Sequence, residues 1–398
     1  MRLNEPLRGF AGALAGPGSS GPGSYTLPIG PGHWHILFGN RSRPLLMPAG
    51  AYRVQRQGIR YFVGSRLKTW YANSLLAANS LLPAARLLPE LRVPPDQRFP
   101  RAFGLPIEGS AQAAVQIGTA GPYQKASVLL MTESGDALAF AKVAMMPSAD
   151  AMVHTEADWL RALETMSALV GQVPRLIARG TTPNGRHYLV TTLAPGTRTT
   201  RAFTPAHAQF LRALGRSRLT AMDFHSAPWV AELECSARDV AAYIENTAAT
   251  TLRAAFHDCR RILRGRCGPL VVAHGDFAPW NIRLHDQRIF VFDWEYASRA
   301  ANPLSDAINY LLIPRAVSGR GIGPRFLANA MHRAAGIAQQ LYPEWRWNPP
   351  EVSALTLGYL LEVLLCYTKS QRQFDSTHPV MESYWHLLVR RRQWLVPS

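Results

Sequence analysis

The residues best suited to chemistry lie in one stretch, where two short apolar runs each lead to an aspartate. The first run, 270–273, continues directly into His-Gly-Asp at 274–276, and Asn281 follows five residues after that aspartate. The second run, 289–292, ends at Asp293. Short apolar runs of this kind predict buried strands, and functional side chains often follow rigid strands. The sequence therefore predicts three polar groups presented at strand ends.

Two carboxylates and one amide in this arrangement suit phosphoryl transfer. A carboxylate such as that of Asp276 can orient or deprotonate an attacking hydroxyl, and the oxygens of Asn281 and Asp293 can hold Mg²⁺ against nucleotide phosphates. The four residues between Asp276 and Asn281 equal the spacing in the protein-kinase catalytic loop. A His-Gly-Asp triplet alone also fits a turn capped by its aspartate, so this interpretation depends on the whole set.

The full string resembles the aminoglycoside phosphotransferase and choline kinase families. Their pattern is His-Gly-Asp-x-x-Pro-x-Asn, followed twelve residues later by an aspartate at the end of an apolar strand, and this chain carries it over 274–293. The resemblance extends over about 106–398. It implies Asp276 as the catalytic residue, Asn281 and Asp293 as metal ligands, and ATP and Mg²⁺ as cofactors.

The same resemblance implies the fold class. The chain should be α+β, with a bilobal protein-kinase-like fold. A small β-rich N-lobe with one crossing helix would precede a larger, mainly helical C-lobe, and an N-terminal α+β extension would come before both.

A lysine in the middle of an apolar strand adds a second group of candidate residues. Lys142 is one of only four lysines in a chain with 43 basic residues, and it stands in the apolar run 137–144. A buried ammonium needs a counter-ion, and helical spacing places Glu156 on the apolar face of a predicted helix over 149–166. Either residue alone could be a solvated charge. The resemblance implies a pair in which the lysine holds the α- and β-phosphates and the glutamate holds the lysine.

Two loops are candidates for contact with a nucleotide. Gly118, Thr119 and Gly121 lie between two predicted strands, and glycine lets a backbone approach phosphate closely. A plain hairpin loop fits equally well, because G-x-G-x-x-G is absent. The resemblance implies that Thr192 and Leu193, at the end of a strand, form the hinge whose backbone meets adenine.

Two further polar residues are expected to shape the site rather than react. Asp306 stands at the start of a predicted helix over 307–312, so we expect a helix cap or a structural hydrogen-bond acceptor. His274 is expected to organise the loop that it begins.

The chain divides into segments of different composition. We expect a disordered tail over 1–24, which is rich in Gly, Pro and Ser, and an N-terminal extension of unknown role over 25–105. A nucleotide-binding N-lobe is expected over 106–193, and a helical C-lobe for catalysis and acceptor binding over 194–398.

Within the extension, apolar spacing predicts strands over 34–38 and 59–63 and a helix over 70–88. Repeated prolines predict a linker at about 89–106. The chain after residue 195 is expected to be mainly helical, with helices over 209–214, 240–263, 354–366 and 384–395.

Composition and cysteine usage indicate a soluble, cytoplasmic protein. The chain has 398 residues, of which 47% are hydrophobic and 17% charged, enough for more than one domain core. The longest apolar stretch, 360–366, is too short to cross a membrane and contains Glu362. We expect no membrane span and no signal peptide. The four cysteines lack C-x-x-C spacing, so no disulfide framework or metal knuckle is expected.

The net charge of +17 is mostly arginine and is spread along the chain, which argues against nucleic acid as a partner. It favours a neutral or anionic acceptor, although the family resemblance also allows a polycation.

The leading hypothesis is ATP-dependent transfer of phosphate to a hydroxyl of a small molecule, such as a sugar, a glycosylated metabolite or an aminoglycoside-like compound. The alternatives are a metallophosphoesterase, which would need further His-rich motifs, and a non-catalytic pseudokinase or basic scaffold that binds an anionic partner. The oligomeric state is not indicated.

Overall fold

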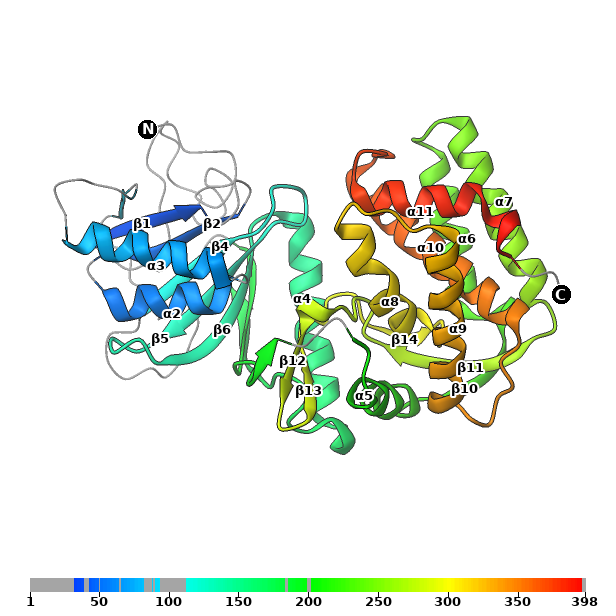
Figure 1. Ribbon diagram of the computed structural model, residues 1–398, viewed down its shortest axis with the longest axis horizontal. Helices are drawn as coiled ribbons and strands as arrows, with labels where there is room; N and C mark the ends of the chain where they lie inside the picture. Colours follow the sequence, from blue (N-terminus) through cyan, green and yellow to red (C-terminus); the bar gives the residue numbers. More distant parts are fainter. Residues whose placement is uncertain are drawn as a thin grey trace. The chain divides into compact units, whose positions relative to one another are not determined.

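The structure is a computed structural model of the chain, shown in Figure 1, and it describes residues 32–38, 43–49, 51–63, 66–81, 88, 90–93, 112–182, 185–198 and 202–395. It contains two compact units. The sheet unit holds the described residues within 1–161 and 174–193, and the helical unit holds those within 162–173 and 194–398. The expected fold class is confirmed: a β-rich antiparallel N-terminal part and a mainly helical C-terminal part.

The sheet unit is built on one antiparallel sheet of eight strands in the order β3-β1-β2-β4-β5-β6-β8-β7. The strands are β1 (Gly32–Phe38), β2 (Pro44–Pro48), β3 (Glu90–Val93), β4 (Gln112–Ile117), β5 (Lys125–Met131), β6 (Ala137–Ala144), β7 (Leu176–Thr181) and β8 (His187–Thr191). Strand β2 pairs with β4, with Leu45 opposite Gln116. The N-terminal extension and the expected nucleotide-binding lobe therefore contribute to a single sheet.

Three helices cover one face of this sheet. Side chains alternate between the two faces of a strand, so Leu129 of β5 lies on the face opposite to Val128. Helices α2 (Tyr52–Phe62) and α3 (Arg66–Leu81) pack on the Leu129 face, side by side in Figure 1. Helix α4 (Pro147–Glu164) packs on Ala144 of β6, which belongs to the same face.

Helix α2 corrects one expectation for the extension, because residues 59–62 are helical rather than a strand. Val54, Gly58 and Ile59 form a buried helical face against the sheet, and this burial outweighs the strand preference of the β-branched and aromatic residues. Gly58 makes the close approach possible, since a Cβ there would lie 2.7 Å from that of Ala114. This close packing offsets the loss of helix stability, about 1 kcal/mol, that glycine causes inside a helix.

The other expectations for the sheet unit are confirmed in part. The strand over 34–38 belongs to β1, the helix expected over 70–88 is α3 and ends at Leu81, and β3 falls within the segment expected to be a linker. The expected strands of the lobe and the crossing helix α4 are present, whereas β7 was not predicted. The tail over 1–24 and the rest of the linker, 94–106, lie outside the described residues.

The helices of the helical unit, apart from the first, pack around one large apolar core. In chain order, the helices of this unit are α5 (Pro205–Arg216), α6 (Pro228–Ala241), α7 (Asn246–Leu263), α8 (Ser305–Val317), α9 (Pro324–Leu341), α10 (Pro349–Gln371) and α11 (Pro379–Val389). Five of them begin with proline, which suits the first helical position because no intrahelical partner exists there for an N–H. The single helix expected over 240–263 is wrong, because α6 ends at Ala241 and α7 begins at Asn246.

Two small sheets hold the His-Gly-Asp segment and its neighbours. One contains β10 (Thr220–Asp223), β11 (Cys267–Ala273) and β14 (Ser298–Ala301), and the other contains β13 (Arg288–Val291), β12 (Ile282–His285) and β9 (Thr197–Arg198). Strand β11 leads into 274–276, and the β12–β13 hairpin connects Asn281 to Asp293. The two apolar runs are therefore strands, as predicted.

Helix α10 is long and apolar enough to cross a membrane, and it is the one such helix among the described residues. Its most apolar window is 78% buried inside the protein, and it supplies side chains to the core of the helical unit.

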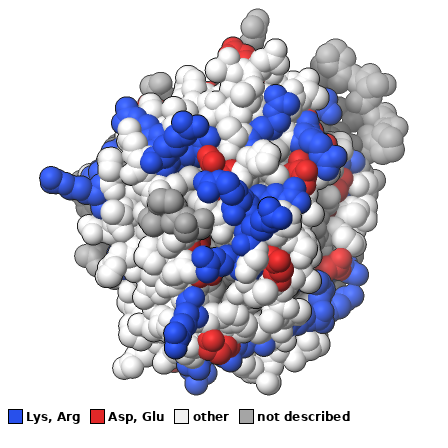
Figure 2. All heavy atoms as spheres, turned by 90° about the vertical axis from the view of Figure 1, so that its right-hand side faces the viewer, with Lys and Arg blue, Asp and Glu red and all other residues white. Residues whose placement is uncertain are grey.

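Basic residues are spread over the surface, as they are along the sequence. Figure 2 shows basic side chains dispersed over the face of the helical unit, with acidic side chains between them. The four cysteines are all free thiols.

Candidate active site

The loop after β11 is fixed by a buried carboxylate. Asp306, in the first turn of α8, accepts the backbone N–H of His274 at 2.7 Å and that of Gly275 at 3.0 Å. Burial raises the pKa of Asp306 to about 6, and the two backbone bonds act in the opposite direction. The helix cap position is Leu304, so Asp306 is a structural acceptor rather than a cap.

His274 connects the two strand ends. Its Nδ1 accepts the backbone N–H of Asp276 at 3.2 Å, and its Nε2 donates to the carbonyl of Phe292 at 3.1 Å. The buried ring lies edge-on to Trp294, with centroids 4.6 Å apart. Both ring nitrogens are therefore used for structure, as expected of a residue that organises the loop.

The backbone conformation at position 275 explains why glycine stands between the histidine and the aspartate. Its φ is +81°, in the left-handed region that side chains disfavour. A Cβ at this position would lie 2.1 Å from the carbonyl oxygen of Tyr296. No residue with a side chain fits without moving the Tyr296 backbone, so the loop that presents Asp276 depends on glycine.

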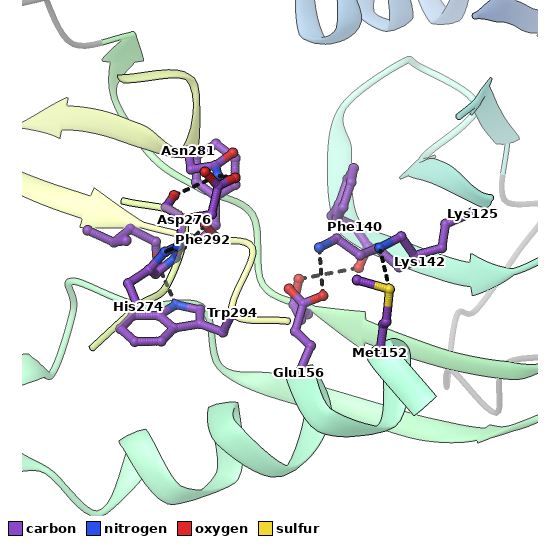
Figure 3. Close-up of polar contacts among 12 residues, drawn as sticks. Lys125, Phe140, Lys142, Met152, Glu156, His274, Asp276, Asn281, Phe292 and Trp294 are labelled. Carbon is purple, nitrogen blue, oxygen red and sulfur yellow. Dashed lines mark hydrogen bonds and ion pairs between the residues drawn. The ribbon is translucent and has the colours of Figure 1, made fainter. Parts of the chain in front are cut away.

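Asp276 is held by two amide donors. Asn281 donates from Nδ2 to one carboxylate oxygen at 2.8 Å, and Asn309 donates from Nδ2 to the other at 3.3 Å (Figure 3 draws the first bond). Burial, followed by the charge of Asp293, raises the pKa of Asp276 to about 7 against the effect of these bonds. A carboxylate with a pKa near neutrality is suited to accept a proton from an alcohol.

Asn309 and the tyrosine behind it were not predicted from the sequence. The hydroxyl of Tyr359 donates to Oδ1 of Asn309 at 2.6 Å, so the amide must present its nitrogen to Asp276. Tyr384 lies 3.0 Å from the Tyr359 hydroxyl and continues this buried chain. The available signal was spacing: Asn309 lies one helical turn after Asp306 in an otherwise apolar segment.

Asp293 has an unusual backbone conformation. Its φ is +75°, which is uncommon for a residue other than glycine, and such conformations concentrate at functional sites. The preceding residue, Phe292, donates its N–H to the carbonyl of Asn281 at 3.1 Å, which ties the two segments together.

The donor set suits Mg²⁺. The amide nitrogen of Asn281 is used toward Asp276, so its oxygen is the group left to coordinate a cation. Carboxylate and amide oxygens are hard ligands of the kind that Mg²⁺ prefers. A cation here would also offset the repulsion between Asp276 and Asp293.

In the sheet unit, the expected ion pair is present. Nζ of Lys142 on β6 lies 2.6 Å from Oε2 of Glu156 on α4, and the side chains are only 11% and 4% exposed (Figure 3). Lys142 points to the helix-covered face of the sheet because it alternates with Val143, which lies in the opposite core. The ammonium and the carboxylate therefore neutralise each other in a buried position.

The glycine loop is the hairpin between β4 and β5. Gly118 donates its N–H to the carbonyl of Lys125 at 2.8 Å, and the exposed Thr119 accepts a hydrogen bond from Nε of Arg43 at 2.9 Å. Gly121 lies in open space at the tip.

Thr192 and Leu193, the expected hinge, make contacts within the sheet unit. The N–H of Thr192 donates to the carbonyl of Arg175 at 3.0 Å, and its hydroxyl accepts the Arg175 N–H at 3.0 Å. Leu193 is half-buried against the cluster that includes α2. The site residues predicted from sequence thus form two groups, one in each unit.

Comparison with solved structures gives distant similarity. A thermostable mutant of aminoglycoside phosphotransferase APH(4)-Ia, in its apo form, is 16% identical with a TM-score of 0.48, over 70% of this chain and 94% of that chain. Aminoglycoside phosphotransferase APH(3'')-Id from Streptomyces rimosus is 19% identical with a TM-score of 0.40, over 62% and 92%. Amicoumacin kinase hAmiN is 15% identical with a TM-score of 0.45, over 69% and 88%.

Comparison at the level of sequence identifies the family. No curated protein matches this chain. The model of the phosphotransferase enzyme family, APH, matches residues 127–347, which is more than half of the chain and includes both the ion pair and the His-Gly-Asp segment. The chain therefore belongs to the phosphotransferase enzyme family and is a small-molecule phosphotransferase.

Proposed function

We propose that the protein transfers the γ-phosphate of ATP to a hydroxyl group of a small molecule, with Asp276 as the catalytic residue. The observation that carries this proposal is the carboxylate of Asp276, fixed at both oxygens by Asn281 and Asn309 and with a pKa raised to about 7 by burial and Asp293. Each oxygen keeps a lone pair for the acceptor hydroxyl. The carboxylate orients that hydroxyl and takes its proton as the oxygen attacks the γ-phosphate, while the bond to the β-phosphate oxygen breaks and ADP leaves.

The remaining residues bind the nucleotide. Lys142, positioned by Glu156, contacts the α- and β-phosphates, and the loop from Gly118 to Gly121, with Thr119, covers the phosphates through its backbone. The carbonyl of Thr192 and the backbone of Leu193 face the adenine. Asn281 and Asp293 would hold Mg²⁺, which when bound neutralises phosphate charge.

The local field around Asp276 favours an acceptor that carries an amine. The carboxylates of Asp293 and Glu295 act on Asp276, and those of Glu362, Asp276 and Glu295 act on the exposed thiol of Cys366, with Lys369 acting in the opposite direction. The exposed carboxylate of Glu362 lies in the field of two further carboxylates, those of Glu232 and Asp306. Several acidic groups therefore act on the same region of the helical unit, and local charge decides recognition more than the net charge of +17.

The two other function classes fit less well. A metallophosphoesterase needs a set of histidine and carboxylate ligands, whereas His274 uses both ring nitrogens in structural bonds. A basic scaffold would not need the hydrogen-bonded arrangement of Asp276, Asn281 and Asn309. We place the enzyme in the cytoplasm, where ATP is present and the four thiols stay reduced.

Titration calorimetry with ATP tests the nucleotide and metal assignments. Wild type is expected to bind ATP with a micromolar dissociation constant in the presence of Mg²⁺ and much more weakly in EDTA. Asp293→Asn should weaken Mg²⁺-dependent binding at least about tenfold, because the replacement removes a charged ligand. Asp286→Asn, an exposed aspartate in the β12–β13 turn, is the matched control. Metal-independent ATP binding that is equal in all three proteins would contradict the assignment.

A further inference from the structure

Helix α2 of the N-terminal extension lies on the face of the sheet that carries Lys142. Phe140 and Lys142 alternate along β6, so their side chains share this face. Phe140 contacts two aromatic residues at the end of α2. The extension therefore covers the sheet directly beside the expected phosphate-binding lysine.

Tyr61, Phe62 and Phe140 form a compact aromatic group. The ring of Tyr61 lies 5.7 Å from that of Phe140 at an interplanar angle of 31°, and 5.4 Å from that of Phe62 at 77°. The rings of Phe62 and Phe140 are 6.5 Å apart. All three side chains are only half-buried, so the group keeps open apolar surface.

This aromatic group lies beside the expected hinge. In the pairing of β6 with β8, Phe140 stands opposite Thr191, the residue before Thr192. Leu193 packs against the same cluster as Tyr61 and Phe62. A base whose edge met the backbone of Thr192 and Leu193 would therefore have these rings next to it.

We propose that Tyr61 and Phe62, together with Phe140, form the surface that receives the purine base of the nucleotide. Flat aromatic side chains stack on any base, and stacking of this kind contributes strongly to nucleotide affinity. The inference rests on the proposed function, since it assumes that ATP binds at Lys142 and the hinge. It goes further because Tyr61 and Phe62 lie outside residues 127–347, the part of the chain that the family model matches. It gives the N-terminal extension a role in nucleotide binding.

The packing of α2 on the sheet supports this proposal. Gly58 allows α2 to sit directly on β4, and Gln55 donates a buried hydrogen bond to the carbonyl of Pro48 at 2.7 Å. These contacts fix the middle of α2 on the sheet, and Tyr61 and Phe62 follow in its last turn. The two rings are therefore presented by an anchored helix rather than by a free segment.

Calorimetry with two ligands tests this proposal. Tyr61→Ala and Phe62→Ala should each raise the dissociation constant for Mg²⁺-ATP about tenfold, the size expected for loss of one stacked ring. Mg²⁺-tripolyphosphate, which has no base, should bind wild type and variants equally. Trp70→Ala is the matched control, because Trp70 is an aromatic residue of α3 that is 67% exposed and outside the group. Phe62→Leu, which keeps an apolar side chain, should fold as wild type does and still bind ATP more weakly.

The outcomes separate this inference from the proposed function. Wild type that binds neither ligand would overturn both. Wild type that binds ATP, with Tyr61 and Phe62 variants that bind it equally well, would overturn the inference alone. Tighter ATP binding by the variants would also overturn it, because α2 would then cover the base site instead of completing it. Equal loss of ATP and tripolyphosphate affinity would indicate a general structural role and would contradict stacking.

Discussion

Replacing Asp276 by asparagine is expected to reduce the rate of phosphate transfer by about 10²- to 10⁴-fold, the range for loss of a general base. The asparagine keeps the shape of the side chain but cannot take the proton of the acceptor hydroxyl. ATP affinity should change much less than the rate, because Lys142, Glu156 and the hinge lie in the other unit and the charged Mg²⁺ ligand Asp293 is kept. Single-turnover assays with ATP and calorimetry of the same samples measure the two effects separately.

Stability serves as the internal control for this variant. The substitution removes a carboxylate whose burial and repulsion by Asp293 are unfavourable, but it leaves one of the two donors, Asn281 or Asn309, facing an amide nitrogen. These changes oppose each other, so the free energy of unfolding should stay within about 1 kcal/mol of wild type. An Asp276→Asn enzyme that folds normally and keeps more than a tenth of the transfer rate would contradict the assigned role.

Replacing Lys142 by methionine is expected to impair both stability and nucleotide binding. Glu156, only 4% exposed, would lose the ammonium 2.6 Å away, and breaking a buried pair from one side costs about 3–5 kcal/mol of unfolding free energy. ATP affinity should fall at least about tenfold, because charge-assisted bonds to the phosphates are lost. Denaturant unfolding and calorimetry report the two effects.

A double variant separates structure from function at this pair. Lys142→Met combined with Glu156→Gln leaves no uncompensated buried charge, so most of the lost stability should return. Its ATP affinity should remain as low as that of the single variant. Lys68→Met, which removes an exposed lysine of α3, controls for the loss of one positive charge. Recovery of ATP binding in the double variant would show that Lys142 is only structural.

The sequence was most informative where local chemistry determines structure. The strands that lead to His274 and Asp293 were predictable because short apolar runs end there in polar residues. The Lys142–Glu156 pair was predictable because a lysine inside an apolar strand requires a counter-ion, and helical spacing identified it. Both inferences depend on burial patterns that a single sequence records.

Features that depend on distant contacts were not predictable. Residues 59–62 favour a strand locally, and their helical structure depends on the burial of α2 against the sheet. Asn309 became a candidate only when α8 was seen to bring it to Asp276. The pairing of β2 with β4 joins segments about 70 residues apart, which no local pattern reveals. The nearness of Tyr61 to Phe140 follows from that pairing.

Transfer of labelled γ-phosphate from ATP to a panel of small alcohols is the most direct test of the central claim. The panel should contain amine-bearing sugars, neutral sugars and acidic sugars, each with wild type and Asp276→Asn. We predict Mg²⁺-dependent transfer by wild type to at least one acceptor, with amine-bearing acceptors preferred, and loss of that transfer in the variant. Transfer that Asp276→Asn supports at the wild-type rate, or wild type that binds Mg²⁺-ATP but phosphorylates no member of the panel, would contradict this account.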